Sequence, residues 1–204
     1  MFVLSLVRQF CPDKLPVQPD ERLGEGADGE VFTITGVPDK VLKLGILYEH
    51  HNGKLDTYYK HIQKTLDYLI ETQPRAYARV YEHGYLGTYS RTMPYWRSGH
   101  QKFIIYYYTM EKLQKTTEDE RKVFHSILSH EDRGIEKNFS TAQIVEALQG
   151  MSCGLDFDTG KVITFCSDIR EASIVHLDIE VRNIMKDVDG NFKLIDFDRA
   201  QVRR

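Results

Sequence analysis

Polar residues whose spacing suits phosphoryl-transfer chemistry gather in the last third of the chain. The stretch 174–185 reads Ile-Val-His-Leu-Asp-Ile-Glu-Val-Arg-Asn-Ile-Met, which places Asp178 and Asn183 five positions apart. Phosphoryl transfer needs a base near the attacking hydroxyl and oxygen ligands for the magnesium ion on the phosphates. Asp178 and Asn183 on one loop can meet these needs separately. Asp189-Gly190 predicts a hairpin that brings Asp196 back to the same loop.

A glycine-rich segment near the N-terminus adds a second feature of this chemistry. Residues 23–31 read Leu-Gly-Glu-Gly-Ala-Asp-Gly-Glu-Val and match the pattern G-x-G-x-x-G-x-V. Glycines let backbone N–H groups approach phosphate oxygens that a Cβ atom would keep away. In dinucleotide-binding folds the same short pattern opens a helix. Here residues 30–34 have the composition of a strand, which favours a hairpin flap over phosphates.

The elements that must position these residues change character along the chain. Alternation and β-branched or aromatic content predict strands, and an apolar stripe at helical spacing predicts a helix over 55–70. We expect strands at 21–34 (two, around the glycine turn), 41–44, 79–85 and 103–110, with a polar loop over 87–101. The apolar segment 1–10 is expected to be a first strand or a patch docked on the body.

The second half of the chain is predicted to be helical. Thr117 and Glu120 have the spacing of a capping box at a helix start, as do Ser140 and Gln143. A third helix is expected over 161–172, followed by the hairpin of 183–186 and 192–195. A boundary near 112–115 divides the chain into lobes of 1–111 and 112–204. The predicted class is therefore α+β and bilobal.

Taken in order, these motifs resemble those of the protein-kinase-like superfamily. The stretch 174–200 is similar to the catalytic loop, hairpin and metal-binding turn of protein kinases, and the glycine turn and Lys43 precede it in the expected order. The resemblance covers about residues 23–200, although the middle is matched only by the order of its elements. It implies a small antiparallel-sheet lobe with one helix above a reduced helical lobe, with ATP bound between the lobes.

The resemblance also implies roles for the loop residues. Asp178 would be the catalytic base, and Asn183 and Asp196 would be magnesium ligands. His176 would anchor the loop, although a buried histidine with satisfied hydrogen bonds explains it equally well. Arg182 would neutralise the transferred phosphoryl group, because Glu180 stands where many serine/threonine kinases have a lysine.

The nucleotide site implied by the resemblance lies mainly in the first lobe. Met110 would lie at the back of the adenine pocket, and the backbone of Glu111 and Leu113 would hydrogen-bond adenine. The residues implied to bind ATP are Gly24, Gly26, Gly29, Val31, Lys43, Met110, Glu111 and Leu113.

Lys43 is the predicted partner of the α- and β-phosphates. Taken by itself it is better explained as an exposed lysine on a half-buried strand. The resemblance implies that a helix-borne acid pairs with it, and counting back from the next strand favours Asp67, with Glu71 as the alternative.

Departures from the kinase pattern keep the acceptor open. Leu177 replaces the arginine that pairs with a phosphorylated activation loop, and Asp198 replaces the glycine of Asp-Phe-Gly. The sequence stops at Arg204, shortly after Asp196, so we expect it to lack the usual platform for a peptide substrate unless a partner protein completes the second lobe. The expected function is an ATP-dependent protein serine/threonine kinase. The alternatives are a kinase of lipopolysaccharide sugars or of small molecules such as aminoglycosides and choline, and a nucleotide-binding pseudokinase.

Composition sets the remaining expectations. The net charge of −3 and the lack of a long basic run argue against nucleic acid as the main partner. No segment has the ~18 consecutive apolar residues of a membrane span. The three cysteines lack metal-ligand spacing, which predicts free thiols and a cytoplasmic protein.

Overall fold

The computed structural model describes residues 3–26, 28–49, 54–92, 100–129, 144, 145, 148 and 155–203. The chain forms two compact units: 1–66 with 80–112, and 67–79 with 113–204. The predicted capping box at Ser140 and Gln143 lies outside the described residues. The α+β class is confirmed, because helices occur beside antiparallel sheets in the order that the kinase-like resemblance implies.

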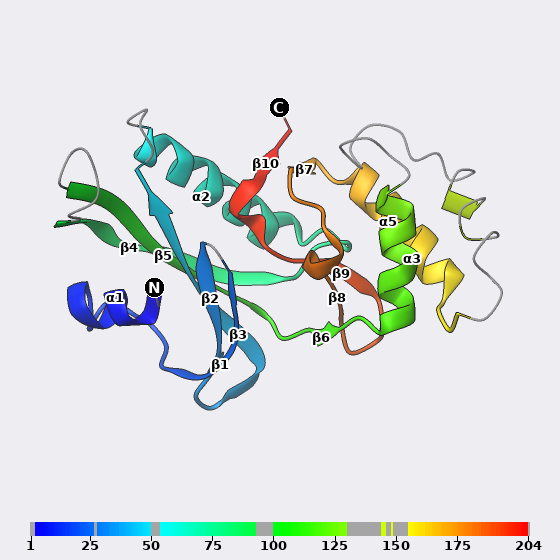
Figure 1. Cartoon of the computed structure of the whole chain (residues 1–204), viewed down its shortest axis with the longest axis horizontal. Coiled ribbons are helices and arrows are strands. Elements are labelled where there is room, and N and C mark those ends of the chain that lie inside the picture. The colour runs from blue at the N-terminus through cyan, green and yellow to red at the C-terminus, as the bar shows by residue number, and fades with distance from the viewer. Residues whose placement is uncertain are drawn as a thin grey trace. The chain divides into compact units, whose positions relative to one another are not determined.

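The first unit is built on a five-stranded antiparallel sheet of order β1-β2-β3-β5-β4 (Figure 1). The strands are β1 Pro19–Gly26, β2 Gly29–Ile34, β3 Val37–Tyr48, β4 Val80–Thr92 and β5 His100–Glu111. β4 and β5 are longer than predicted, and they occupy both ends of the expected polar loop over 87–101. The cross-strand pairs run from Val80↔Met110 to Thr92↔His100, so pairing with β5 holds this polar sequence in a strand.

Residues Val3–Phe10 form the helix α1, so the alternative of a first strand is wrong and that of a docked patch is confirmed. Val3, Leu6 and Val7 are buried, and this i, i+3, i+4 spacing makes one apolar helix face. A buried carboxylate completes the arrangement, because the backbone N–H of Leu4 donates to Glu30 Oε2 at 2.8 Å. A negative charge at the first turn satisfies an N–H that has no partner within the helix.

The helix α2, Leu55–Thr72, follows the predicted stripe of 55–70. Leu55, Ile62, Leu66 and Leu69 are its buried leucine and isoleucine residues. Residues 55–66 belong to the first unit, and residues 67–72 belong to the second.

The second unit combines helices with short strands. The helices are α3 Glu118–Ser129 and α5 Thr159–Glu171, with the 3-10 turns η1 Val181–Asn183 and η2 Phe197–Arg199. The strands are β6 Gln114–Lys115, β7 Ile174–His176, β8 Ile184–Lys186, β9 Phe192–Leu194 and β10 Ala200–Val202. The rings of Phe124, Phe165 and Phe192 pack edge-to-face with centroids 4.8–6.0 Å apart, which joins α3, α5 and β9.

The predicted start of α3 is confirmed. Thr117 N–H donates to Glu120 Oε2 at 2.6 Å, and Glu120 N–H donates to Thr117 Oγ1 at 3.2 Å, which is the geometry of a capping box. The start of α5 has a cap that was not predicted. Asp158 accepts from the backbone N–H of Lys161 at 3.0 Å. The second Asp-Phe-Asp sequence, at 156–158, therefore includes a helix cap.

The predicted hairpin between β8 and β9 is confirmed, with Ile184↔Leu194 and Lys186↔Phe192 as cross-strand pairs. Gly190 has φ +75°, where glycine is favoured. Asp187 holds the turn, since its carboxylate accepts from the backbone N–H of Asp189 at 3.0 Å and of Asn191 at 2.8 Å.

Candidate active site

The loop that carries Asp178 is framed by an antiparallel pair of short strands. β10 pairs with β7 through Ala200↔His176 and Val202↔Ile174, so the chain beyond Asp196 returns beside the strand that precedes Asp178. His176, which is 2% exposed, lies 2.9 Å through Nε2 from the carbonyl oxygen of Ile195. Because a carbonyl can only accept, the ring nitrogen that faces it must carry the proton. This bond joins the two segments that lead into Asp178 and Asp196.

Asp178 and Asn183 are in direct contact. The side-chain amide of Asn183 donates to the backbone oxygen of Asp178 at 2.9 Å, and it lies 3.5 Å from the Asp178 carboxylate. Asn183 is 4% exposed, and its backbone oxygen accepts from the N–H of Ile195 at 2.9 Å. The structure therefore brings these two predicted residues together and joins them to the segment that leads into Asp196.

Asp196 has a left-handed backbone, with φ 67° and ψ 76°. This conformation is costly for a residue with a Cβ, and it persists only where the surroundings hold it. Both sides of Asp196 are held. On one side, the N–H of Ile195 donates to the backbone oxygen of Asn183, and its carbonyl oxygen accepts from His176. On the other side, the ring of Phe197 is fully buried, and its centroid lies 6.4 Å from that of Tyr77 and 6.3 Å from that of His176.

The protonation of His176 reflects its surroundings. Burial lowers the pKa of His176 below its ordinary value, against the opposing effects of the Ile195 hydrogen bond and of the negative charges of Asp196 and Asp178. Both carboxylates thus lie close enough to act on one ring. The neutral imidazole is the form that this loop contains, because Nδ1 is buried without a hydrogen-bond partner among the described residues.

Two arginines lie on this loop and on the turn after Asp196. Arg182 is exposed, and its Nε lies 2.8 Å from the Glu180 carboxylate. Arg199 was not predicted from the sequence, yet its Nη1 lies 3.8 Å from the Asp178 carboxylate. The only sequence signal for it was a basic residue three positions after Asp196.

In the first unit, the glycine-rich segment forms the predicted hairpin of β1 and β2. Its register pairs Gly24 with Val31 and Gly26 with Gly29. A Cβ on Gly29 would lie 2.5 Å from the backbone oxygen of Leu44, so the sheet itself requires that glycine. A Cβ on Gly24 or Gly26 would meet nothing within 4 Å in the described part of the chain. Packing among the described residues therefore does not explain these two glycines.

Lys43 lies on β3, opposite Val31 on β2 and Tyr108 on β5. It is 6% exposed, so the alternative of an exposed lysine is wrong. Its Nζ lies 5.6 Å from the centre of the Tyr108 ring, a cation–π distance. A lysine is rarely this buried, because desolvation of its charge is costly.

The other predicted nucleotide residues lie at the end of β5 and in the segment that follows. Met110 is buried and Glu111 is half-buried at the end of that strand, whereas the half-buried Leu113 belongs to the second unit. Asp67 and Glu71 are both exposed on α2 and belong to the second unit. Which of them pairs with Lys43 stays a prediction.

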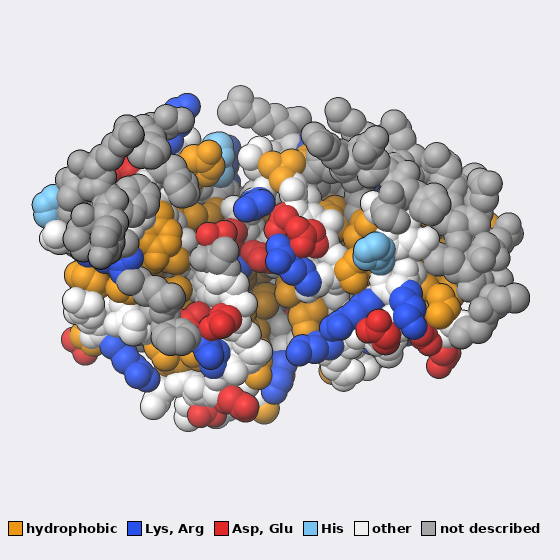
Figure 2. Space-filling model, viewed as in Figure 1, with side chains coloured by type: hydrophobic (Ala, Val, Ile, Leu, Met, Phe, Trp, Pro, Cys, Tyr) orange, Lys and Arg blue, Asp and Glu red, His pale blue; other side chains and the backbone are white. Residues whose placement is uncertain are grey.

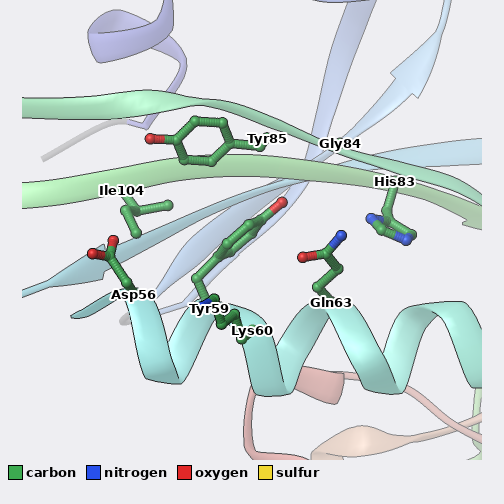
Figure 3. Close-up of a pocket in the computed structure, with 8 residues that line it drawn as sticks. All are labelled: Asp56, Tyr59, Lys60, Gln63, His83, Gly84, Tyr85 and Ile104. Carbon is green, nitrogen blue, oxygen red and sulfur yellow. The ribbon is translucent and has the colours of Figure 1, made fainter. Parts of the chain in front are cut away.

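A pocket of about 530 Å³ lies in the first unit between α2 and the strands β4 and β5. Figure 3 shows Tyr59 and Gln63 projecting from α2 toward these strands, where His83, Tyr85 and Ile104 lie. The Tyr59 ring is 5.3 Å from that of Tyr85. The described residues that line this pocket include none of those predicted to bind ATP or to act in catalysis.

The described residues contain no group of three or more His, Cys, Asp or Glu side chains placed to bind a metal. Magnesium does not need one, because it is commonly held by one or two carboxylates together with phosphate oxygens. The described helices also include none that is long and apolar enough to cross a membrane.

No family model and no curated protein matches the chain. Among solved structures it is similar to WbdD in a co-crystal with the kinase inhibitor LY294002, with 15% identity and a TM-score of 0.40. It is also similar to a high-resolution structure of WbdD, with 15% identity and a TM-score of 0.42, and to monomeric WbdD, with 16% identity and a TM-score of 0.41. These alignments cover 90–93% of this chain but 34–37% of the WbdD chains. The chain thus spans about a third of the length of the proteins it matches, at a similarity too low to assign an activity.

Proposed function

We propose that this chain is an ATP-dependent phosphotransferase that transfers the γ-phosphoryl group to a hydroxyl, with serine or threonine as the first acceptor to test. The observation that carries the proposal is the contact of Asn183 with Asp178 on one loop. Hydrogen bonds join this loop to Ile195, the residue that precedes Asp196 and its left-handed backbone. This loop provides a carboxylate for the hydroxyl and oxygen donors for a cation. Phosphoryl transfer requires those two elements.

Asp178 is suited to accept the proton of the acceptor hydroxyl. Its backbone oxygen is fixed by the Asn183 amide, and Arg199 lies 3.8 Å from its carboxylate. A positioned base of this kind contributes about 10²–10⁴-fold to a rate. The fixed backbone supports this role because a base must be held within hydrogen-bond reach of the proton.

The donor set fits a magnesium ion. The nitrogen of the Asn183 amide is used by Asp178, which leaves the amide oxygen as the atom that can ligate a cation, and Asp196 supplies a carboxylate. Both are the oxygen donors that magnesium prefers. Magnesium held by Asn183 and Asp196 would neutralise negative charge on the phosphates.

The residues of the glycine hairpin, Lys43 and the end of β5 with Leu113 are assigned to the nucleotide. Gly24 and Gly26 leave their backbone open to phosphate oxygens, and the buried Lys43 supplies a positive charge. Met110, Glu111 and Leu113 are assigned to adenine, and Val31 and Gly29 to the hairpin that covers the phosphates. The sugar or small-molecule kinase and the nucleotide-binding pseudokinase remain the alternatives that the experiment separates.

The test is transfer of labelled γ-phosphate from magnesium-ATP by the wild type and by Asp178→Ala, with a generic protein acceptor and mass spectrometry to locate the label. We expect Asp178→Ala to lower the rate by about 10²–10⁴-fold while ATP still binds. Asp196→Ala should weaken binding of magnesium-ATP itself. Asp156→Ala is the matched control, because this exposed aspartate begins the other Asp-Phe-Asp sequence.

The outcomes separate the candidates. Label on serine or threonine in the wild type alone supports a protein kinase. Tight magnesium-ATP binding without protein label favours a sugar, a small molecule or a required partner. Near-normal transfer by Asp178→Ala would show that the base is assigned wrongly. A wild type that neither transfers phosphate nor binds magnesium-ATP would overturn the phosphotransferase and favour an interaction module that binds no nucleotide.

A further inference from the structure

A second pocket, of about 470 Å³, lies wholly within the second unit beside the loop of Asp178. Its walls come from the segment of β6, from α3, and from η1 and β8. Three of its lining residues are cationic, namely Lys115, Arg121 and Arg182. Figure 2 shows Lys and Arg side chains gathered over β6 and the beginning of α3. None of the predicted ATP-binding residues is among the described residues that line it.

The charges of this pocket are unbalanced. The described residues that line it include no Asp or Glu. Arg182 is paired with Glu180 at 2.8 Å, but within the described part of the chain neither Lys115 nor Arg121 has an ion pair. Lys122, the neighbour of Arg121, is paired with Asp119 at 3.4 Å. Like charges that face one concave space raise the local concentration of anions.

The remaining walls are apolar. Val181, Ile184 and Met185 line the pocket together with the cationic side chains. An apolar surface with a few convergent charged groups is the usual composition of a small-ligand site, and the volume lies within the range of such sites. The occupant should therefore combine an anionic group with a less polar body.

The position of the pocket connects it with the proposed chemistry. Val181 and Arg182 belong to η1, the turn between Asp178 and Asn183. Arg182 comes four positions after Asp178, so their Cα atoms lie within about 14 Å of each other by chain geometry alone. One acceptor molecule can therefore present a hydroxyl to Asp178 and an anionic group to this pocket.

We propose that the pocket binds a phosphomonoester group carried by the acceptor, an inference that rests on the proposed phosphotransferase function. A phosphomonoester carries about −1.5 to −2 charges at pH 7, whereas a carboxylate carries one. Lys115 and Arg121, the two cations lining this pocket that have no ion pair with a described residue, match the larger charge. The fork of an arginine guanidinium also suits phosphate oxygens, which it can bind through two parallel hydrogen bonds.

Binding is tested first, without any need for transfer. Inorganic phosphate is titrated into the full chain and followed by NMR chemical shifts, with and without saturating magnesium and a non-hydrolysable ATP analogue. We expect Arg121→Gln and Lys115→Gln each to raise the Kd for phosphate about 10-fold, as expected for loss of one charge-assisted contact. Lys122→Gln is the matched control and should change the Kd less than about 2-fold. Equal weakening by the control, or displacement of phosphate by the ATP analogue, would overturn the assignment.

Transfer is tested next with two matched pairs of acceptors. One pair is a serine peptide with and without a neighbouring phosphoserine, and the other is a hexose with and without a 6-phosphate. We expect the phosphorylated member of one pair to have a kcat/KM at least about 10-fold higher, and Arg121→Gln to remove that advantage. The pair that responds identifies whether the phosphate belongs to a peptide or to a sugar.

The two proposals fail in different ways. Transfer without preference for a phosphorylated acceptor would overturn this inference and leave the phosphotransferase intact. Phosphate binding by a chain that neither binds magnesium-ATP nor transfers phosphate to any acceptor would overturn the phosphotransferase and the acceptor role, and it would keep the pocket as a phosphate site.

Discussion

His176, which precedes the loop of Asp178, makes the stability of the fold depend on pH. Its ring is 2% exposed, Nε2–H is committed to Ile195, and Nδ1 is buried without a partner among the described residues. A proton added at Nδ1 would create a buried donor that has no hydrogen-bond partner among the described residues, and burial lowers the pKa of His176. The perturbation is a change of pH from about 7.5 to about 5.5, a range that spans the ordinary histidine pKa, compared between the wild type and His176→Gln.

The sign and size of the effect follow from linkage. In the unfolded chain His176 takes up a proton near its ordinary pKa of about 6.5, whereas in the folded chain its pKa is lower. Between these two pKa values the unfolded state binds more protons, so the free energy of unfolding falls as the pH falls. Going from pH ~7.5 to ~5.5 removes at most about 1.4 kcal/mol through this residue, the limit for a folded pKa well below the lower pH.

The assay is urea denaturation at both pH values, because the midpoint and slope give the free energy of unfolding. His176→Gln cannot titrate, so its loss between the two pH values should be smaller than that of the wild type by up to about 1.4 kcal/mol. His125→Gln, at an exposed site on α3, is the control and should retain the wild-type difference. Equal losses for His176→Gln and the wild type would refute the buried, neutral histidine.

Three further predictions concern single residues. Gly29→Ala should lower the free energy of unfolding by about 1–3 kcal/mol, because the added Cβ would lie 2.5 Å from the backbone oxygen of Leu44. Gly24→Ala is its control and should leave urea denaturation nearly unchanged, because a Cβ there meets no described atom within 4 Å. Thr117→Ala should cost about 1 kcal/mol in the same assay, because the helix α3 loses its capping hydroxyl. Cys166 should resist a thiol reagent at mildly alkaline pH in the folded protein and react in urea, because burial raises its pKa to about 12.

Much of the local structure could be predicted because it depends on neighbouring residues. The glycine turn between β1 and β2, the capping box at Thr117 and the hairpin around Gly190 all match the expectation. Each depends on residues a few positions apart, so the pattern and its cause are visible together in the sequence. The contact of Asp178 with Asn183 has the same origin, since both lie on one short loop.

The features that could not be predicted depend on distant residues. α1 is a helix because its apolar face packs on the sheet and because Glu30, 26 positions after Leu4, accepts from its first turn. The polar ends of β4 and β5 become strands through pairing with each other. The ion pair of Arg199 with Asp178 arises because β10 returns beside β7. Neither periodicity nor composition contains these contacts.

Several features that cost stability fall at the residues predicted to bind magnesium-ATP. Lys43 buries a charged side chain, Asp196 has a left-handed backbone, and Gly24 and Gly26 are glycines that no described neighbour requires. A protein that binds no nucleotide would need few of these features, and burial of a charge and a left-handed backbone at a residue with a Cβ are each costly in free energy. Natural proteins retain such features mainly where function depends on them. Their coincidence with one set of motifs therefore supports a magnesium-ATP site, which a phosphotransferase and a nucleotide-binding pseudokinase would share and which the test of transfer separates.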